Sequence, residues 1–379
     1  MKVLHLDIEG GQGGSSRSLR YLVQGLKKMN VDSEVWHAKP GPSVLANKKN
    51  NIRCRINKNI VSIIPLRSNN LKNMALMSLK FFRLPLLALE IKKKDVDILH
   101  LNYEGLLLLA FILRLMGFKK KIIVHVRTPM PKNYFSFFFC RLFKFVDGVI
   151  YITKIEKKLF ELASKLKFKN FIINHNPAPD LLKYKYKFRN KKNFFKAIFL
   201  GNIDQTKAPD RIIDLAKKTK KMGLPIKYYI YGKEKKTLFR KKNIINENSI
   251  LELINDYDLK KYVFYMGHTE KPEVIINSSD IIIRPSRNGD CWGRDVIEGM
   301  SAGLLVIATG NEKVFLTHKK SGLLYKVWDT NLIAKDLAVI LKDKKLFLKY
   351  KKHAYQFAKK EFSISKHTIK TFSFFKKFI

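Results

Sequence analysis

Short apolar runs alternate with amphipathic stretches along the first half of the chain. Residues 3–7 have the pattern of a buried strand, and apolar residues at helical spacing follow a glycine-rich turn at residues 10–14. Further β-rich runs occupy residues 34–37, 98–101, 122–126 and 148–152, with helical patterns between them. Strands that alternate with helices in this way predict a parallel, doubly wound sheet.

The same alternation begins again in the second half. Strands are expected at residues 197–200, 228–231, 263–265, 281–283 and 305–308. Prolines at 177 and 179 and a basic run at 183–192 interrupt the pattern between the halves. The sequence therefore predicts an α/β protein with two Rossmann-like domains, residues 1–180 and 181–355. A C-terminal helix at 356–379 is expected to cross back to the first domain.

The composition is that of a reduced protein without a membrane span. The chain has 379 residues, 46% of them hydrophobic, which suffices for two cores. Cys54, Cys140 and Cys291 lack disulfide or zinc-ligand spacing, so the cytoplasm is the expected compartment. The start does not resemble a signal peptide, and the longest apolar run, 105–118, is shorter than a bilayer span and contains Arg114.

The charge bounds the partners rather than the fold. Lys and Arg number 75 against 31 Asp and Glu, a formal net charge of +44. Such a charge concentrates polyanions or acidic lipid surfaces around a protein, but a lysine-rich composition bias explains it equally well. Zinc-finger, RNA-recognition and homeodomain signatures are missing from the sequence, and its lysines are spread along the chain. Nucleic acid is therefore not an expected partner.

The glycine-rich loop after the first strand is a candidate phosphate site. Gly13 and Gly14 lie where backbone N–H groups at a helix N-terminus can approach a phosphate. The loop has neither the Gly-Lys-Ser/Thr of a Walker motif nor GxGxxG spacing. A tight strand-to-helix turn without a ligand remains the alternative.

The most informative stretch follows the strand at 281–283. Asp290 lies in a turn, a helix opens near Gly293, and Glu298 stands eight residues after Asp290. The two acids can face one cleft, and a carboxylate can accept hydrogen bonds from two sugar or ribose hydroxyls. Alternatively, Asp290 only caps the helix.

These residues resemble the signature of the family-4 retaining glycosyltransferases, which have the GT-B architecture of two Rossmann-like domains facing a central cleft. That signature is an acid, seven residues and a glutamate within a proline- and glycine-containing frame. The matching positions are Pro285-Ser286, Gly293, Glu298-Gly299-Met300, Gly303 and Val306-Ile307-Ala308. Weaker matches occur at 147–150, 201–207, 310–312 and 362–364. Asp290 replaces the family's first glutamate, and Asn202 replaces its usual arginine.

The resemblance implies a hexosyltransferase that moves a sugar from a nucleotide-sugar donor to a glycan or lipid-linked acceptor. Synthesis of surface polysaccharide or lipopolysaccharide is the expected setting, with no cofactor and no metal, since nothing is recognised as a metal-binding Asp-x-Asp site. A catalytically inactive nucleotide-sugar-binding partner is the alternative.

The resemblance also implies roles for individual residues. The expected donor-binding residues are Gly13, Gly14, Lys207, Cys291, Trp292, Gly293, Arg294 and Glu298, with Lys207 neutralising the diphosphate. Arg294 or Arg284 could replace the cation missing at Asn202. The expected catalytic residues are Asp290, His125 and Arg127. The last two lie near the end of the strand at 122–126, where the family has a histidine, and either could occupy that position. His100 is more easily read as a core residue.

A basic aromatic stretch suggests contact with an anionic membrane surface. Its apolar members are Phe135, Phe137, Phe138, Phe139, Leu142, Phe143 and Phe145, interleaved with Lys132, Arg141 and Lys144. Phenylalanine surrounds the helix more completely than one buried stripe requires, which favours an interfacial position over core packing. The protein is therefore expected to be peripheral on the inner face of a membrane.

Overall fold

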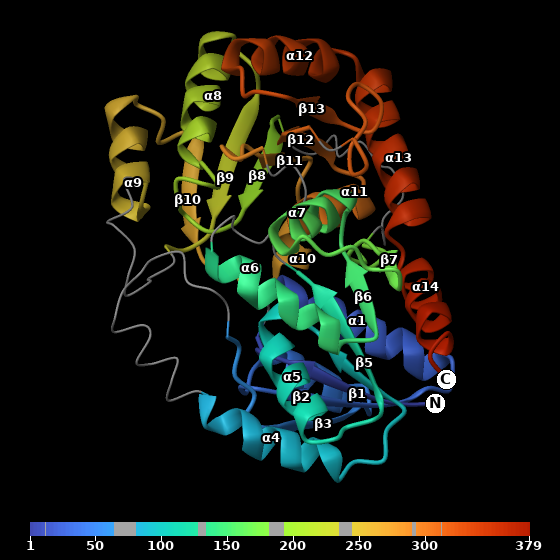
Figure 1. Ribbon diagram of the computed structural model, residues 1–379. Coiled ribbons are helices and arrows are strands. Elements are labelled where there is room, and N and C mark those ends of the chain that lie inside the picture. The colour runs from blue at the N-terminus through green and yellow to red at the C-terminus, as the bar shows by residue number, and fades with distance from the viewer. Residues whose placement is uncertain are drawn as a thin grey trace. The chain divides into compact units, whose positions relative to one another are not determined.

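The computed structural model describes residues 1–11, 13–63, 81–127, 134–181, 193–234, 245–289, 293–311 and 313–379. These residues form two compact units, one of Met1–Pro177 with Ile364–Ile379 and one of Ala178–Ser363. Each unit is built on a parallel sheet with helices packed against it (Figure 1). The predicted α/β class with two Rossmann-like, doubly wound domains is therefore confirmed.

A seven-stranded sheet forms the first unit, in the order β3-β2-β1-β4-β5-β6-β7. Its strands are β1 (Lys2–Asp7), β2 (Asp32–His37), β3 (Arg53–Ile56), β4 (Ile98–Leu101), β5 (Lys121–Val126), β6 (Gly148–Tyr151) and β7 (Phe171–Ile173). The direction in which strands are added reverses between β1 and β4. In open parallel sheets, ligands bind beyond the carboxyl ends of the strands at such a switch point.

Alternate residues of this sheet pack on its two faces. Leu4 and Leu99 face a core shared with helices α4 (Arg83–Lys92) and α5 (Leu107–Leu115). Val3 and Ile98 face the other core, to which α1 (Gly14–Lys28) and α14 (Ile364–Lys376) contribute. Because both faces are covered, the inner strands are apolar over most of their length. The remaining helical elements of the unit are α2 (Pro42–Lys49), η1 (Glu104–Leu106), α6 (Tyr134–Arg141), η2 (Leu142–Phe145) and α7 (Lys154–Ser164).

The C-terminal helix α14 is part of the first unit, where it lies beside α1 (Figure 1). Asn174 Nδ2 donates hydrogen bonds to the His367 carbonyl at 3.0 Å and to Thr371 Oγ1 at 2.8 Å. A Cβ atom on Gly25 of α1 would lie 2.1 Å from Thr368 Oγ1, so only glycine permits this close approach. The last helix is thereby fixed to residues far earlier in the chain.

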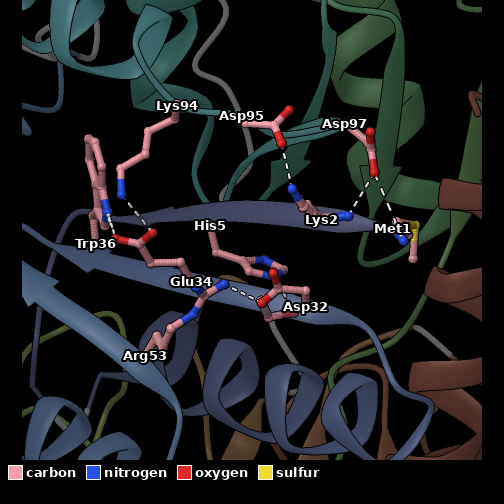
Figure 2. A network of polar contacts seen from close by, with 11 residues as sticks. Met1, Lys2, His5, Asp32, Glu34, Trp36, Arg53, Lys94, Asp95 and Asp97 are labelled. Atoms are coloured by element: carbon pink, nitrogen blue, oxygen red, sulfur yellow. Dashed lines mark hydrogen bonds and ion pairs between the residues drawn. The ribbon is translucent and has the colours of Figure 1, made fainter.

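The charged groups at the starts of the strands pair with one another, as Figure 2 shows. Lys2 Nζ donates to Asp95 at 2.5 Å, and the Lys2 backbone N–H donates to Asp97 at 2.7 Å. The sequence thus contains Asp-x-Asp spacings at 95–97 and 256–258, which the expectation of a chain without a metal-binding Asp-x-Asp site did not take into account. At 95–97 the two carboxylates are engaged at the edge opposite the carboxyl ends of the strands.

The second unit has a six-stranded sheet in the order β10-β9-β8-β11-β12-β13, with its own switch point between β8 and β11. Its strands are β8 (Phe195–Leu200), β9 (Ile226–Tyr231), β10 (Val263–Gly267), β11 (Ile281–Arg284), β12 (Leu305–Thr309) and β13 (Leu323–Tyr325). Its helices are α8 (Asp210–Lys221), α9 (Glu247–Asp256), α10 (Pro272–Asn277), α11 (Arg294–Ser301), α12 (Thr330–Lys342) and α13 (Lys344–Glu361). The two faces of the sheet carry separate cores.

The basic aromatic stretch lies in α6 and η2, and part of it is core. Phe139 and Phe143 are buried, and the Phe143 ring centroid lies 4.0 Å from that of Phe160. The Arg141 guanidinium covers the half-buried Phe137 ring at 4.4 Å. The interfacial interpretation is therefore wrong for Phe139 and Phe143, whereas the side chains of Phe135 and Phe138 lie outside the described residues. Among the residues that the structure describes, no helix is long and apolar enough to cross a membrane.

Candidate active site

Two motif loops meet at the switch point of the second unit. The loops after β8 and β11 follow neighbouring parallel strands, in which Ile281 of β11 pairs with Ala197 of β8. The Arg287 backbone N–H donates to the Thr206 carbonyl at 2.9 Å, and Ser286 Oγ donates to the same carbonyl at 3.2 Å. The structure thus brings together two sequence motifs that lie about eighty residues apart.

Lys207 lies in the first of these loops, in a turn fixed by Asp204. The Asp204 carboxylate accepts the Lys207 backbone N–H at 2.8 Å, and its carbonyl accepts the Ala208 N–H at 3.0 Å. Lys207 is half-exposed and follows Thr206, the residue bonded to the β11 loop. This position beyond a strand end suits a cation that faces a phosphate.

Glu298 is buried in α11 and is paired with Arg294. Its side chain is 2% exposed and that of Arg294 is 11% exposed, and Arg294 Nη2 donates to Glu298 Oε1 at 2.5 Å. The two residues are one helical turn apart, so the helix itself brings them together. A buried carboxylate is stable in its charged form only with such a partner.

The start of α11 holds a second buried ion pair. Arg284 Nη1 donates to Asp295 Oδ1 at 2.7 Å, with both side chains at most 10% exposed. A Cβ atom on Gly293 would lie 2.6 Å from Arg284 Nη1, so this guanidinium requires glycine at the helix cap. Arg284 and Arg294, the two cations suggested as replacements at Asn202, therefore each have an acid beside them.

Three predicted residues of this site, Asp290, Cys291 and Trp292, lie outside the described residues. Their positions are fixed only by the sequence, between Gly289 at the end of the β11 loop and Gly293 at the helix cap. The roles expected of these three residues stay predictions.

In the first unit, the glycine-rich loop leads directly into α1. Gly13 precedes Gly14, the first residue of the helix, and its carbonyl accepts the Arg17 N–H at 3.1 Å. A Cβ atom on Gly13 would lie 2.4 Å from a Glu9 carboxylate oxygen. The first helical turn contains no acid, and helix N-terminal amides suit an anion, but here the Glu9 carboxylate already lies beside Gly13.

Arg127 links the carboxyl ends of several strands. Its Nη2 donates to Asn102 Oδ1 at 2.5 Å, its Nη1 to Asn176 Oδ1 at 2.6 Å, and its backbone N–H to Glu104 Oε2 at 2.7 Å. Asn102 Nδ2 in turn donates to Asp7 Oδ1 at 3.3 Å. These residues follow β5, β4 and β7 or end β1, so they form one polar network across the switch point.

His125 lies deeper in the same strand, within a cluster of imidazoles. It is fully buried, and its ring centroid lies 5.9 Å from that of His100 and 6.4 Å from that of His367. Neither ring nitrogen has a hydrogen-bond partner among the described residues. Burial, and then the charge of Arg127, lower the pKa of His125 well below its usual value. His125 is therefore a neutral core histidine, and His100 is fully buried as the core reading predicts.

Two family models match the chain, one on each half. The model described as glycosyl transferases group 1 matches residues 182–357, and the model described as glycosyltransferase family 4 matches residues 12–178. Together they span both units and include both motif loops.

The chain belongs to the family-4, group 1 glycosyltransferases.

Relatives of this glycosyltransferase agree on the fold. HepE of Anabaena, in complex with UDP-glucose, is 15% identical with a TM-score of 0.78, each chain being covered to 100%. TarM of Staphylococcus aureus, crystallised as a mutant with UDP, fondaparinux and α-GlcNAc-glycerol, is 14% identical with a TM-score of 0.72 and 99% coverage of each chain. A curated relative, the poly(ribitol-phosphate) α-N-acetylglucosaminyltransferase of Staphylococcus aureus, is 24% identical over 199 residues. That match spans 50% of this chain and 36% of the relative.

Several polar residues of this glycosyltransferase join the site although their sequence context did not predict it. Glu104 and Asn176 contact Arg127, and His37 Nδ1 lies 2.9 Å from Asp7 Oδ2. Asp7 and His37 each end a strand, which is a signal that could have drawn attention to them. Asn176 lies in a loop before Pro177, and its partnership with Arg127 follows only from the fold.

Proposed function

We propose that this glycosyltransferase is a retaining hexosyltransferase that moves a sugar from a nucleotide-sugar donor to a glycan or lipid-linked acceptor. The observation that carries the proposal is the junction of the β8 and β11 loops, with buried Glu298 in the helix that follows. The names of the relatives support polysaccharide synthesis as the setting, since HepE is solved with UDP-glucose and the curated relative modifies poly(ribitol phosphate).

The donor is proposed to bind at the second unit. Glu298 accepts hydrogen bonds from donor hydroxyls, and Lys207 stabilises the negative charge of the diphosphate. Gly293 keeps the entrance of α11 free of a side chain. Gly13 and Gly14, at the start of α1 in the first unit, are proposed as donor-binding residues because their amide N–H groups suit a phosphate. Asp290, Cys291 and Trp292 complete the donor site by their place in the motif.

Arg127, rather than His125, is proposed as the catalytic residue of the first unit. The guanidinium remains protonated at any working pH and lies at the strand ends, where ligands of such sheets bind. His125 is enclosed, and its neutral form is favoured. Arg127 can bind an oxygen of the sugar or phosphate through donors that Asn102 and Asn176 already orient.

The proposed chemistry is a front-face displacement, which the family resemblance supports. The bond from the anomeric carbon to the diphosphate breaks as the acceptor oxygen bonds to the same face of that carbon. The acceptor proton passes to the departing phosphate oxygen. Lys207 and the loop amides supply positive potential without a metal ion.

A catalytically inactive nucleotide-sugar-binding protein is the second candidate. Asn202 lacks the positive charge that the family places there, and Arg294 holds the carboxylate that would bind the donor. Such a protein would bind donor without turning it over.

Incubation with a panel of nucleotide sugars tests the proposal. We expect nucleoside diphosphate to be released from a subset of the panel, at the same rate after chelation of divalent metal. Binding without release would favour the inactive partner. A strict need for manganese or magnesium would contradict the metal-independent site.

A further inference from the structure

Helix α4 carries apolar side chains on the face that points away from its core. Leu87 and Ile91 are buried against the sheet. On the opposite face Phe82, which precedes the helix, is 74% exposed, Leu86 54% and Leu89 47%. Spacings of four and three residues place these side chains in one row along the helix. Phe82, Leu86 and Leu89 are called the α4 stripe below.

Cations flank the α4 stripe. Arg83 and Lys93 are exposed near its two ends, and Lys92 is exposed beside it. Lys92 Nζ donates to the Met116 carbonyl at 2.6 Å, which ties this end of α4 to the end of α5. Leu115, the last residue of α5, is 70% exposed.

The acid within α4 is already occupied by other partners. Glu90 accepts hydrogen bonds from Arg55 at 2.7 Å and from Asn57 and Asn59 at 3.1 Å. Partial burial alone would raise the pKa of Glu90, but these hydrogen bonds and the Arg55 charge lower it. The Glu90 charge is thus compensated by these partners. The exposed cations Arg83, Lys92 and Lys93 therefore leave the surroundings of the α4 stripe with a net positive charge.

Helix α12 shows how an ordinary surface helix of this chain differs. Leu332 and Val339 are exposed there too, but exposed Lys335 lies between them. No three exposed apolar residues follow one another on successive turns of α12. The α4 stripe is thus unlike scattered exposed apolar residues, which are normal on proteins.

We propose that the α4 stripe and its cations dock on an anionic lipid bilayer. A helix with apolar side chains on both its core face and its outer face gains stability when the outer face is also covered, and cations around that face suit acidic headgroups. The 10 residues of α4 extend about 15 Å, half the apolar thickness of a bilayer, so the helix lies in the interface. The net charge of +44 supplies the long-range attraction. This proposal rests on the proposed function in one respect only, which is that the enzyme would encounter a lipid-linked acceptor at this surface.

Sedimentation of the full chain with phospholipid vesicles tests the docking surface. We expect binding to vesicles that contain phosphatidylglycerol, reduced but not abolished by salt, and weaker binding to phosphatidylcholine alone. Leu86→Gln with Leu89→Gln should weaken binding at least about tenfold, equivalent to about 1.4 kcal/mol. The matched control, Leu332→Gln with Val339→Gln on α12, should bind as the wild type does. Arg83→Gln with Lys93→Gln should reduce the salt-sensitive part.

Three results would overturn the docking surface. The first is that the chain does not bind acidic vesicles at low ionic strength. The second is that the α4 and α12 variants bind vesicles equally well. The third is that substitution of the α4 stripe abolishes self-association of the chain but leaves vesicle binding unchanged. Equal melting temperatures of the variants ensure that a loss of binding reflects the surface. Nucleotide-sugar binding without vesicles separates the two claims, because a chain that binds vesicles but no nucleotide sugar refutes only the proposed function.

Discussion

The ion pair between Arg294 and Glu298 allows the structural and functional roles of Glu298 to be separated. Glu298→Ala removes the carboxylate that accepts a hydrogen bond from the Arg294 guanidinium, which is 11% exposed. Removal of one partner from a buried pair costs about 3–5 kcal/mol, and we expect about 3 kcal/mol here because Arg294 retains some access to water. For a unit of this size, that loss lowers the melting temperature by roughly 6–12 °C.

A second substitution should restore stability without restoring the site. Arg294→Met removes the buried charge that faced Glu298 and keeps most of the apolar volume, so the double variant should regain about 2 kcal/mol over Glu298→Ala. Donor affinity should stay low in both variants, because the carboxylate that accepts donor hydroxyls is gone.

Urea denaturation and calorimetric titration with a donor measure the two effects separately. Glu161→Ala is the control, since Lys157 and Glu161 form a pair of the same spacing with side chains more than 20% exposed. That change should cost less than about 1 kcal/mol. If the double variant is as unstable as Glu298→Ala, the ion pair does not stabilise the unit. If Glu298→Ala binds donor normally, the assignment of Glu298 is wrong.

Two further predictions concern the first unit. Arg127→Lys should lower kcat at least about a hundredfold, because one ammonium cannot hold Asn102 and Asn176 as the guanidinium does, whereas His125→Phe should stay within about tenfold of the wild type. The reverse pattern in steady-state kinetics would assign the catalytic position to His125. The unit should also lose stability in acid, because the fold lowers the pKa of His5 to about 3 and those of His100 and His125 well below their usual value. The unfolded chain then binds more protons below about pH 6.5, so His5 costs about 2 kcal/mol between pH 7 and pH 5, and His100 and His125 add to this loss. Urea unfolding at both pH values should show this loss, reduced in His125→Phe, and equal stability at the two pH values would contradict it.

The sequence pattern predicts the central strands well and the edge strands poorly. The expected strands at 98–101 and 281–283 match β4 and the first three residues of β11. They are buried on both faces and therefore read as continuous apolar runs. The strands β3, β7 and β13 were not predicted from the sequence pattern. β3 is an edge strand with two arginines among four residues, and the other two have three residues each, too few for a period to show.

The candidate site was predictable in part. The motif around Glu298 and the loop that contains Lys207 could both be recognised in the sequence. Each follows a predicted strand, and ligands of such sheets bind after the strands. The choice between His125 and Arg127 was not, because it depends on how deeply each side chain lies in the sheet. His367, which lies next to His125, is more than two hundred residues away in the chain. The aromatic stretch misled at Phe139 and Phe143 because both rings are buried in the first unit, which composition does not reveal.

Proton NMR of the first sugar product formed tests the central claim most directly. With an α-linked nucleotide sugar that the wild type consumes, we expect nucleoside diphosphate to appear together with a product whose anomeric proton has the small coupling of an α-linkage. The Glu298→Ala/Arg294→Met variant, folded but without the carboxylate, should form this product at least about a hundredfold more slowly. A β-linked first product, or equal rates in the two proteins, would contradict a retaining transfer that depends on Glu298.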